Sequence, residues 1–137
     1  MKNILKFSLF ALTLTLFIAC SDDDGPTAQI TINSETTGDL GGDFTGNGGT
    51  ASETFTWQNA RTTADYNADI TATASGVLLM NIKDADGTEV LNRTLGNTPE
   101  PDSFSGVTSA GTAGEWTVTI TVTNFSGDGS FSVSAGN

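Results

Sequence analysis

Apolar and polar residues alternate along most of the chain after residue 27, and this period of two is typical of half-buried β-strands. The clearest case is Trp116–Thr123, where apolar residues occupy every second position and threonines occupy the positions between them. A second alternating row runs from Tyr66 to Ala74, and Val77–Met80 is apolar on both sides, which is typical of a central strand. Further strands are predicted by shorter alternating pairs, at Ile30 and Ile32, Phe55 and Trp57, and Phe131 and Val133.

The apolar rows predict a core. We expect these side chains to point inward: Trp57, Ile70, Leu78, Met80, Trp116, Val118, Ile120, Phe131 and Val133.

Turn-forming residues separate the predicted strands. Asp-Gly between alternating segments is a strong hairpin signal, and it occurs at Asp84–Gly87 and at Ser126–Gly129. The glycine-rich segments Gly38–Gly49 and Gly96–Gly114 are expected to be long loops. No segment after the signal-like start shows the helical period of about 3.6 residues. The chain therefore predicts an all-β fold, a single antiparallel, jelly-roll-like β-sandwich of about seven or eight strands over residues 27–137.

Four of these segments together resemble a known family. They are similar to parts of bacterial pre-peptidase C-terminal domains: Phe55–Trp57, Asp84–Gly87, Gly114–Val118 and Gly129–Val133. The resemblance covers residues 50–137. It implies a jelly-roll-like sandwich, which in that family is appended to secreted enzymes and is linked to substrate or surface binding.

The start of the chain has the organisation of a bacterial signal peptide. Two lysines precede a charge-free, mostly apolar run of 13 residues, Phe7–Ala19, which is followed by the only cysteine, Cys20. Such a run is too short for a transmembrane helix, which needs about 20 residues, and fits a signal-peptide core. Phe17–Cys20 resembles the lipobox of Gram-negative lipoproteins, with phenylalanine in place of the usual leucine. The resemblance implies that residues 1–19 are removed and that Cys20 is lipidated.

Residues 20–26 are predicted to form a lipidated acidic tether. Ser21 and the run of Asp22, Asp23 and Asp24 follow the cysteine directly. This pattern resembles the export signal of Bacteroidetes-type surface lipoproteins, which in that family directs the protein to the outside of the cell. The resemblance implies a lipid-anchored protein of the bacterial outer membrane, exposed at the cell surface. The alternatives are the periplasmic face of that membrane, an uncleaved signal anchor, and a secreted protein with a free cysteine.

Charge narrows the range of partners. The residues from Cys20 onward carry three basic side chains against all 16 acidic ones. A surface this acidic repels nucleic acids and anionic lipid head groups, so we expect no nucleic-acid partner. Attachment to the membrane would depend on the acyl chains on Cys20, because two or more such chains anchor a protein stably.

The chemistry available to the chain is narrow. It has no histidine, and lipidation would leave no free thiol and no disulfide. These absences exclude Ser-His-Asp and Cys-His triads, imidazole acid–base catalysis, and zinc sites with histidine or cysteine ligands. Carboxylate-based catalysis, as in glycoside hydrolysis, stays an alternative. We expect no catalytic residues and no enzyme.

Oxygen ligands are abundant, so calcium is the candidate inorganic ligand. The segment that holds Asp84, Asp86 and Glu89 is similar to half of a calcium-binding loop, but it lacks the third ligand expected before the glycine and the distal glutamate. Asp39 and Asp43 in the first glycine-rich segment are a second candidate group. The alternatives are a plain hairpin in which aspartate stabilises the turn, and a solvated loop.

Aromatic residues are the candidate contacts for a ligand. Trp57 and Trp116 share strand faces with apolar neighbours, so we expect them in the core. Phe44, Phe104 and Phe125 lie in loop-like contexts and are the remaining candidates, Phe104 being expected to be the most exposed. The alternative is that such a ring tucks under the end of the sandwich. The alternating threonines of residues 117–123 form a hydroxyl row of the ice-binding kind, although threonine is favoured on exposed strand faces in any case.

Together these features predict an outer-membrane, surface-exposed lipoprotein. Its small non-catalytic β-sandwich would serve binding or adhesion, with a glycan, a protein or another cell-surface ligand as the partner. The alternatives are a structural, periplasmic-facing lipoprotein without a ligand, and a carboxylate-based enzyme.

Overall fold

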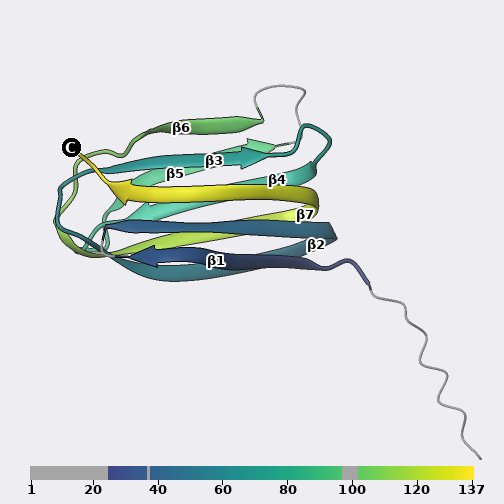
Figure 1. The fold of residues 1–137 in the computed structure, drawn as a ribbon, viewed down its shortest axis with the longest axis horizontal. Helices are drawn as coiled ribbons and strands as arrows, with labels where there is room; N and C mark the ends of the chain where they lie inside the picture. Colours follow the sequence, from purple (N-terminus) through teal and green to yellow (C-terminus); the bar gives the residue numbers. More distant parts are fainter. Residues whose placement is uncertain (1–24, 37, 97–101) are drawn as a thin grey trace, which may run out of the picture.

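The computed structural model describes residues 25–36, 38–96 and 102–137, and these residues form seven antiparallel strands and no helix. The strands are β1 (Ala28–Thr36), β2 (Asp39–Asn59), β3 (Ala64–Ile70), β4 (Ser75–Lys83), β5 (Glu89–Gly96), β6 (Ser103–Val107) and β7 (Gly114–Ala135). The predicted all-β, sandwich-like domain is confirmed (Figure 1). The predictions for Cys20, Ser21 and Asp22–Asp24 fall outside the described residues.

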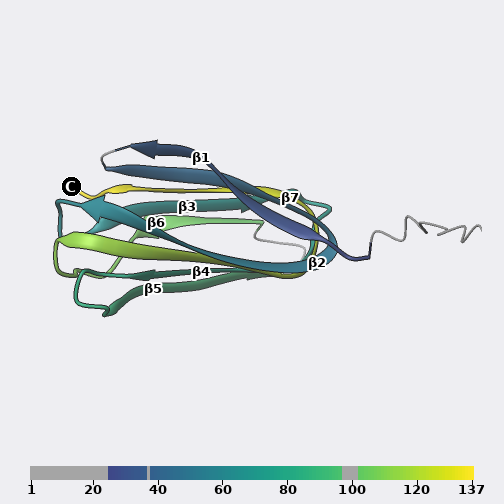
Figure 2. The same cartoon turned by 90° about the horizontal axis from the view of Figure 1, so that it is seen from below.

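The two long strands, β2 and β7, each belong to both layers of the sandwich (Figure 2). The layer that is uppermost in Figure 2 has the order β1-β2-β7-β3-β6, and it uses Asp39–Asn47 of β2 and Ser126–Ala135 of β7. The lower layer uses Ala51–Asn59 of β2 and Gly114–Val122 of β7, followed by β4 and then β5. We refer to them as the upper and lower layers.

Both long strands turn from one layer into the other at the same end of the molecule (Figure 2). β2 has register irregularities on both sides of Gly49, and β7 has left-handed backbone at Asn124 (φ 48°) and Gly127 (φ 127°). The hairpin predicted at Ser126–Gly129 is wrong. The chain bends there, but it keeps its pairing with β2 and continues as the same strand.

The loop predicted over Gly38–Gly49 is also wrong, because most of that segment is strand. Gly42 in this segment has no space for a side chain, because a Cβ there would overlap the backbone oxygen of Thr31 and would lie 2.9 Å from the ring of Phe131. On β7, a Cβ on Gly129 would lie well inside van der Waals contact with the ring of Phe44. Small inward positions therefore lie beside large ones, and the rings fill the interior between the layers.

All nine residues predicted for the core are buried. Trp116 is the largest of the fully buried side chains. Its Nε1 donates a hydrogen bond to the carbonyl oxygen of Thr112 at 2.7 Å, and its ring packs edge-on against Trp57 with centroids 6.0 Å apart. The inward-pointing rows of the sequence are thus confirmed.

Two of the predicted strands differ in detail from the structure. Val77–Met80 lies in β4, which has β5 and β7 as neighbours, so the strand is central. Its outer face is nevertheless open, and Val77 is 42 % exposed. The row that starts at Tyr66 ends with β3 at Ile70, before the expected end at Ala74.

The loop predicted over Gly96–Gly114 is only partly a loop. Ser103–Val107 within it form β6, which pairs with β3 at the edge of the upper layer. Residues 97–101 lie outside the described residues.

Candidate functional site

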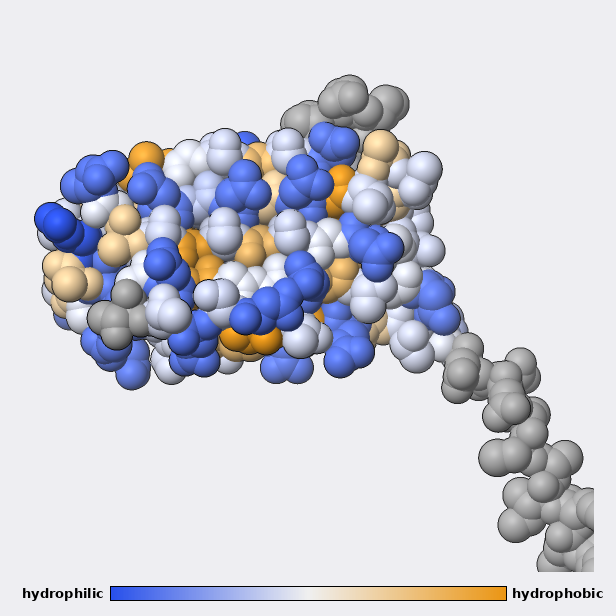
Figure 3. All heavy atoms as spheres, in the orientation of Figure 1, coloured by the Kyte–Doolittle hydropathy of each residue, from blue (hydrophilic) through white to orange (hydrophobic). Residues whose placement is uncertain are grey.

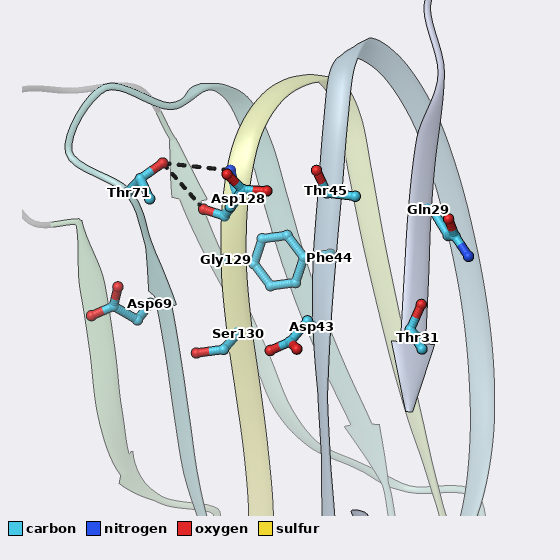
Figure 4. Close-up of a pocket in the computed structure, with 10 residues that line it drawn as sticks. All are labelled: Gln29, Thr31, Asp43, Phe44, Thr45, Asp69, Thr71, Asp128, Gly129 and Ser130. Carbon is cyan, nitrogen blue, oxygen red and sulfur yellow. Dashed lines mark hydrogen bonds between the residues drawn. The ribbon is translucent and has the colours of Figure 1, made fainter. Parts of the chain in front are cut away.

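The outer face of the upper layer gathers five carboxylates, and we call it the acidic face. Strand register sets Asp43 beside Ser130 and Ser130 beside Asp69, so that one carboxylate lies on each side of the serine (Figure 4). The five acidic residues are Asp39 and Asp43 on β2, Asp128 on β7, and Asp65 and Asp69 on β3. Alternation along each strand therefore collects charge on one surface of the molecule, and hydrophilic residues are widespread on this face in the space-filling view (Figure 3).

A hollow of about 530 Å³ lies in this face, close to the end where β2 and β7 bend (Figure 4). It is lined by Gln29, Thr31, Asp43, Thr45, Asp69, Thr71, Asp128 and Ser130, with Phe44 and Gly129 beneath them. Thr71 fixes one wall, because its hydroxyl and its backbone N–H both donate to the carbonyl oxygen of Asp128, at 3.3 and 2.9 Å.

The groups around the hollow are mainly hydrogen-bond acceptors, together with hydroxyls that both donate and accept. Ionised carboxylates form stronger hydrogen bonds than neutral acceptors. An anionic ligand would be repelled by the surrounding aspartates. The arrangement therefore suits a neutral ligand that presents several hydroxyl groups as donors.

The first candidate calcium group lies at the turn between β4 and β5, and the hairpin predicted there is confirmed. Asp84 is only 6 % exposed, and the protein engages both carboxylate oxygens. Oδ1 accepts the backbone N–H groups of Asp86 and Thr88 at 3.0 and 2.8 Å, and Oδ2 accepts that of Thr112 at 2.9 Å. The geometry therefore assigns Asp84 to holding the turn.

These hydrogen bonds, above all the one from Thr112, lower the pKa of Asp84. A carboxylate with a lowered pKa in the folded state contributes stability above its unfolded-state pKa of about 3.9. That contribution is lost as the pH falls through the lowered value. Asp84 is thus a source of acid sensitivity at this turn.

The other candidate calcium ligands do not converge. Asp86 and Glu89 each accept a side-chain hydrogen bond at 2.6 Å from within the protein. Asp39 and Asp43 are four residues apart on one strand, a separation of about 13 Å. Within the described ranges, no three acidic side chains come close enough together to hold a metal ion. We therefore propose no calcium site.

The three phenylalanines predicted as candidate ligand contacts are buried, Phe44 to 2 % exposure, Phe104 to 5 % and Phe125 to 1 %. Phe44 packs edge-on against Phe125 with ring centroids 5.3 Å apart. Phe104 lies beneath Arg93 of β5, whose guanidinium carbon is 5.1 Å from the ring centroid. The prediction is wrong because the glycine-rich surroundings of these residues resemble loops, whereas all three occupy inward positions of strands.

The outer face of the lower layer differs from the acidic face. Register pairs Thr54 with Thr119 and Ser52 with Thr121, and the hydroxyls of these pairs are hydrogen-bonded at 2.8 and 2.7 Å. The threonine row of β7 is thus one half of a two-strand array. We call the array the hydroxyl face; it consists of Ser52, Thr54, Thr56, Thr117, Thr119, Thr121 and Thr123.

Sequence reasoning missed most of the hollow and the β2 half of the hydroxyl face. The signal for the hollow is the alternation of Leu40 and Phe44 with Asp43 and Thr45, which the intervening glycines obscure. The signal for the second half of the hydroxyl face is the row from Ser52 to Thr56 at alternate positions. Neither signal shows which strands become neighbours, so neither surface could be assembled from the sequence.

Comparison of the chain with protein-family models, with curated proteins and with solved structures gives no match. In the part of the chain that the structure describes, no helix has the length and apolarity needed to cross a membrane.

Proposed function

We propose that the protein is a lipid-anchored lipoprotein of the bacterial outer membrane, displayed on the cell surface, whose β-sandwich is a non-catalytic module for binding or adhesion. The signal-like start and its single cysteine, Cys20, support the anchor. The acidic run Asp22–Asp24 supports display on the outside of the cell. Each buried methylene of an acyl chain is worth about 0.8 kcal/mol, so two or more chains hold the protein at the membrane.

The place where the chain enters the sandwich suits a tethered module. Thr27 lies at the end of the molecule where β2 and β7 bend, and its backbone N–H donates to Oδ1 of Asn47 at 2.5 Å. Figure 1 shows β1 starting at this end. A tether that joins one end of the sandwich leaves both outer faces accessible to a ligand.

The single observation that carries the binding proposal is the hollow in the acidic face. Asp43, Asp69 and Asp128 surround it together with Ser130 and several threonines. Hydroxyl groups of a neutral glycan would donate to these carboxylates. Hydrogen bonds to charged groups contribute about 1.5–3 kcal/mol each, so two or three of them give a specific contact. We therefore propose a glycan as the ligand of the hollow.

A glycan array, run with and without calcium on the full-length protein purified from membranes in detergent, tests this function. We expect the wild type to bind neutral glycans. The Asp43→Asn, Asp69→Asn double variant should bind at least roughly tenfold more weakly, because it weakens two charge-assisted hydrogen bonds. The matched control is Glu89→Gln in the lower layer, which removes a carboxylate far from the hollow and should bind like the wild type.

Two outcomes would contradict the proposal. If the folded wild type gives no signal with or without calcium, the module does not bind glycans, and a structural lipoprotein is favoured. If the double variant binds as tightly as the wild type, the hollow is not the contact site.

A further inference from the structure

The hydroxyl face has a chemistry that the acidic face lacks. The chain carries 16 acidic residues, but the seven residues of the hydroxyl face are all neutral. Asn81 of β4, which pairs with Thr119, and Asn92 of β5 extend it with neutral amides. Lys83 and Glu89 lie opposite each other at one end of the face and add no net charge. Glu115, two residues before Thr117 on β7, is a further exposed charge at the same end. The charged groups of this outer face thus lie at one end, and the hydroxyl array itself is neutral.

The hydroxyl groups repeat along each strand and lie side by side across β2 and β7. Successive threonines on β7 are two residues apart, which is about 6.8 Å, and neighbouring strands are about 4.8 Å apart. Register places Thr56 beside Thr117, Thr54 beside Thr119 and Ser52 beside Thr121. Hydroxyl groups therefore form a small lattice, and its repeats are comparable with those of the oxygen atoms on the surfaces of hexagonal ice.

The lattice is also ordered before any ligand arrives. β-Branching restricts the χ1 angle of threonine. The hydrogen bonds between Ser52 and Thr121 and between Thr54 and Thr119, at 2.7 and 2.8 Å, restrict the hydroxyls further. Groups that are already fixed lose little conformational freedom on binding. The threonine methyl groups form no hydrogen bonds, so water between them can keep an ice-like arrangement that the hydroxyls anchor.

A crystalline polysaccharide is the other regular surface of hydroxyl groups, but the side chains favour ice. Flat contact with sugar rings relies on exposed aromatic platforms. The aromatic residues of the same two strand segments, Phe55, Trp57 and Trp116, lie on the inward side of the lower layer. We propose that the hydroxyl face binds ice, with ordered water as the ligand. This proposal does not depend on the glycan hollow, which lies on the opposite layer.

Uptake into a slowly growing ice surface tests the proposal, with the full-length protein in detergent and pure ice as the probe. We expect the wild type to be enriched in the ice relative to the remaining liquid. Thr119→Tyr places a bulky ring at the centre of the lattice and should lose roughly tenfold in uptake, as central positions of a contact surface do. Thr54→Tyr, on an exposed position of β2, should lose uptake in the same way. This second variant keeps the test valid if Thr119→Tyr fails to fold.

The matched control is Ser132→Tyr, an exposed position of the same strand on the acidic face, which should keep the uptake of the wild type. Three outcomes would overturn the proposal: wild-type uptake no greater than that of serum albumin, equal uptake by the folded Thr119→Tyr and Ser132→Tyr variants, or binding to microcrystalline cellulose or chitin in place of ice. A blank glycan array with intact ice uptake would reject only the glycan function.

Discussion

Replacing Trp116 by alanine should lower the free energy of unfolding by about 3–5 kcal/mol, the usual cost of deleting a buried tryptophan side chain. Trp116 has no exposed surface and packs edge-on against Trp57. The substitution removes those contacts, deletes the hydrogen bond to Thr112, and leaves a cavity in the lower layer. For a domain of this size the melting temperature should fall on the order of 10–20 °C.

Thermal and denaturant unfolding of the two proteins measures this loss. Ser132→Ala, on an exposed position of the same strand, should change the stability by less than about 0.5 kcal/mol. A Trp116→Ala variant that melts together with the wild type would show that the inward face of β7 is assigned incorrectly.

Gly129→Ala should also destabilise the sandwich, even though it adds only one methyl group. Its Cβ would overlap the ring of Phe44 and would lie 2.6 Å from the carbonyl oxygen of Asp69. Overpacking of this kind costs about 1–3 kcal/mol, and we expect the upper part of that range because the second clash is with backbone. Gly41→Ala is the matched control, since its Cβ would meet no atom closer than 3.4 Å.

A double-mutant cycle identifies the cause of that loss. Phe44→Leu creates space beside Gly129, so adding it to Gly129→Ala should cost less than adding it to the wild type. Strictly additive losses would contradict the proposed contact between Phe44 and Gly129. Denaturant midpoints of the four proteins supply the four free energies that the cycle needs.

The inward faces of the strands were predictable because they follow local patterns. Trp116–Val122 alternates strictly, and each apolar residue of the row is buried. The turn at Asp84–Gly87 was predictable for a similar reason, since Asp-Gly favours a hairpin with left-handed backbone, and Gly87 has φ 81°.

Whether a glycine-rich segment forms a loop or a strand was not predictable, because glycine occurs in both and its local sequence does not distinguish them. Gly42 and Gly129 lie in strands at positions where a Cβ would collide with atoms of distant segments, among them the rings of Phe131 and Phe44. The bend of β7 near Gly127 lies beside the register irregularity of β2, a pairing that is likewise distant in the sequence. Such long-range pairings decide whether a glycine-rich segment is a strand.

The candidate surfaces depend on register between strands, which alternation alone does not fix. The threonine row of β7 was visible in the sequence, but its pairing with Ser52–Thr56 was not. Asp43 and Asp69 come together only because Ser130 lies between them. For Phe44 and Phe104 the prediction was wrong in another way. Their loop-like surroundings indicated exposed side chains, but both side chains are buried.

The central claim, that the sandwich is displayed outside the cell on a lipid anchor, is tested most directly by protease treatment of intact cells. Cleavage at the tether should release the wild-type domain into the medium while a periplasmic control protein stays intact. A variant with Asp22, Asp23 and Asp24 all changed to alanine should remain cell-associated and protected. A wild-type protein that is as protected as the periplasmic control would contradict the account.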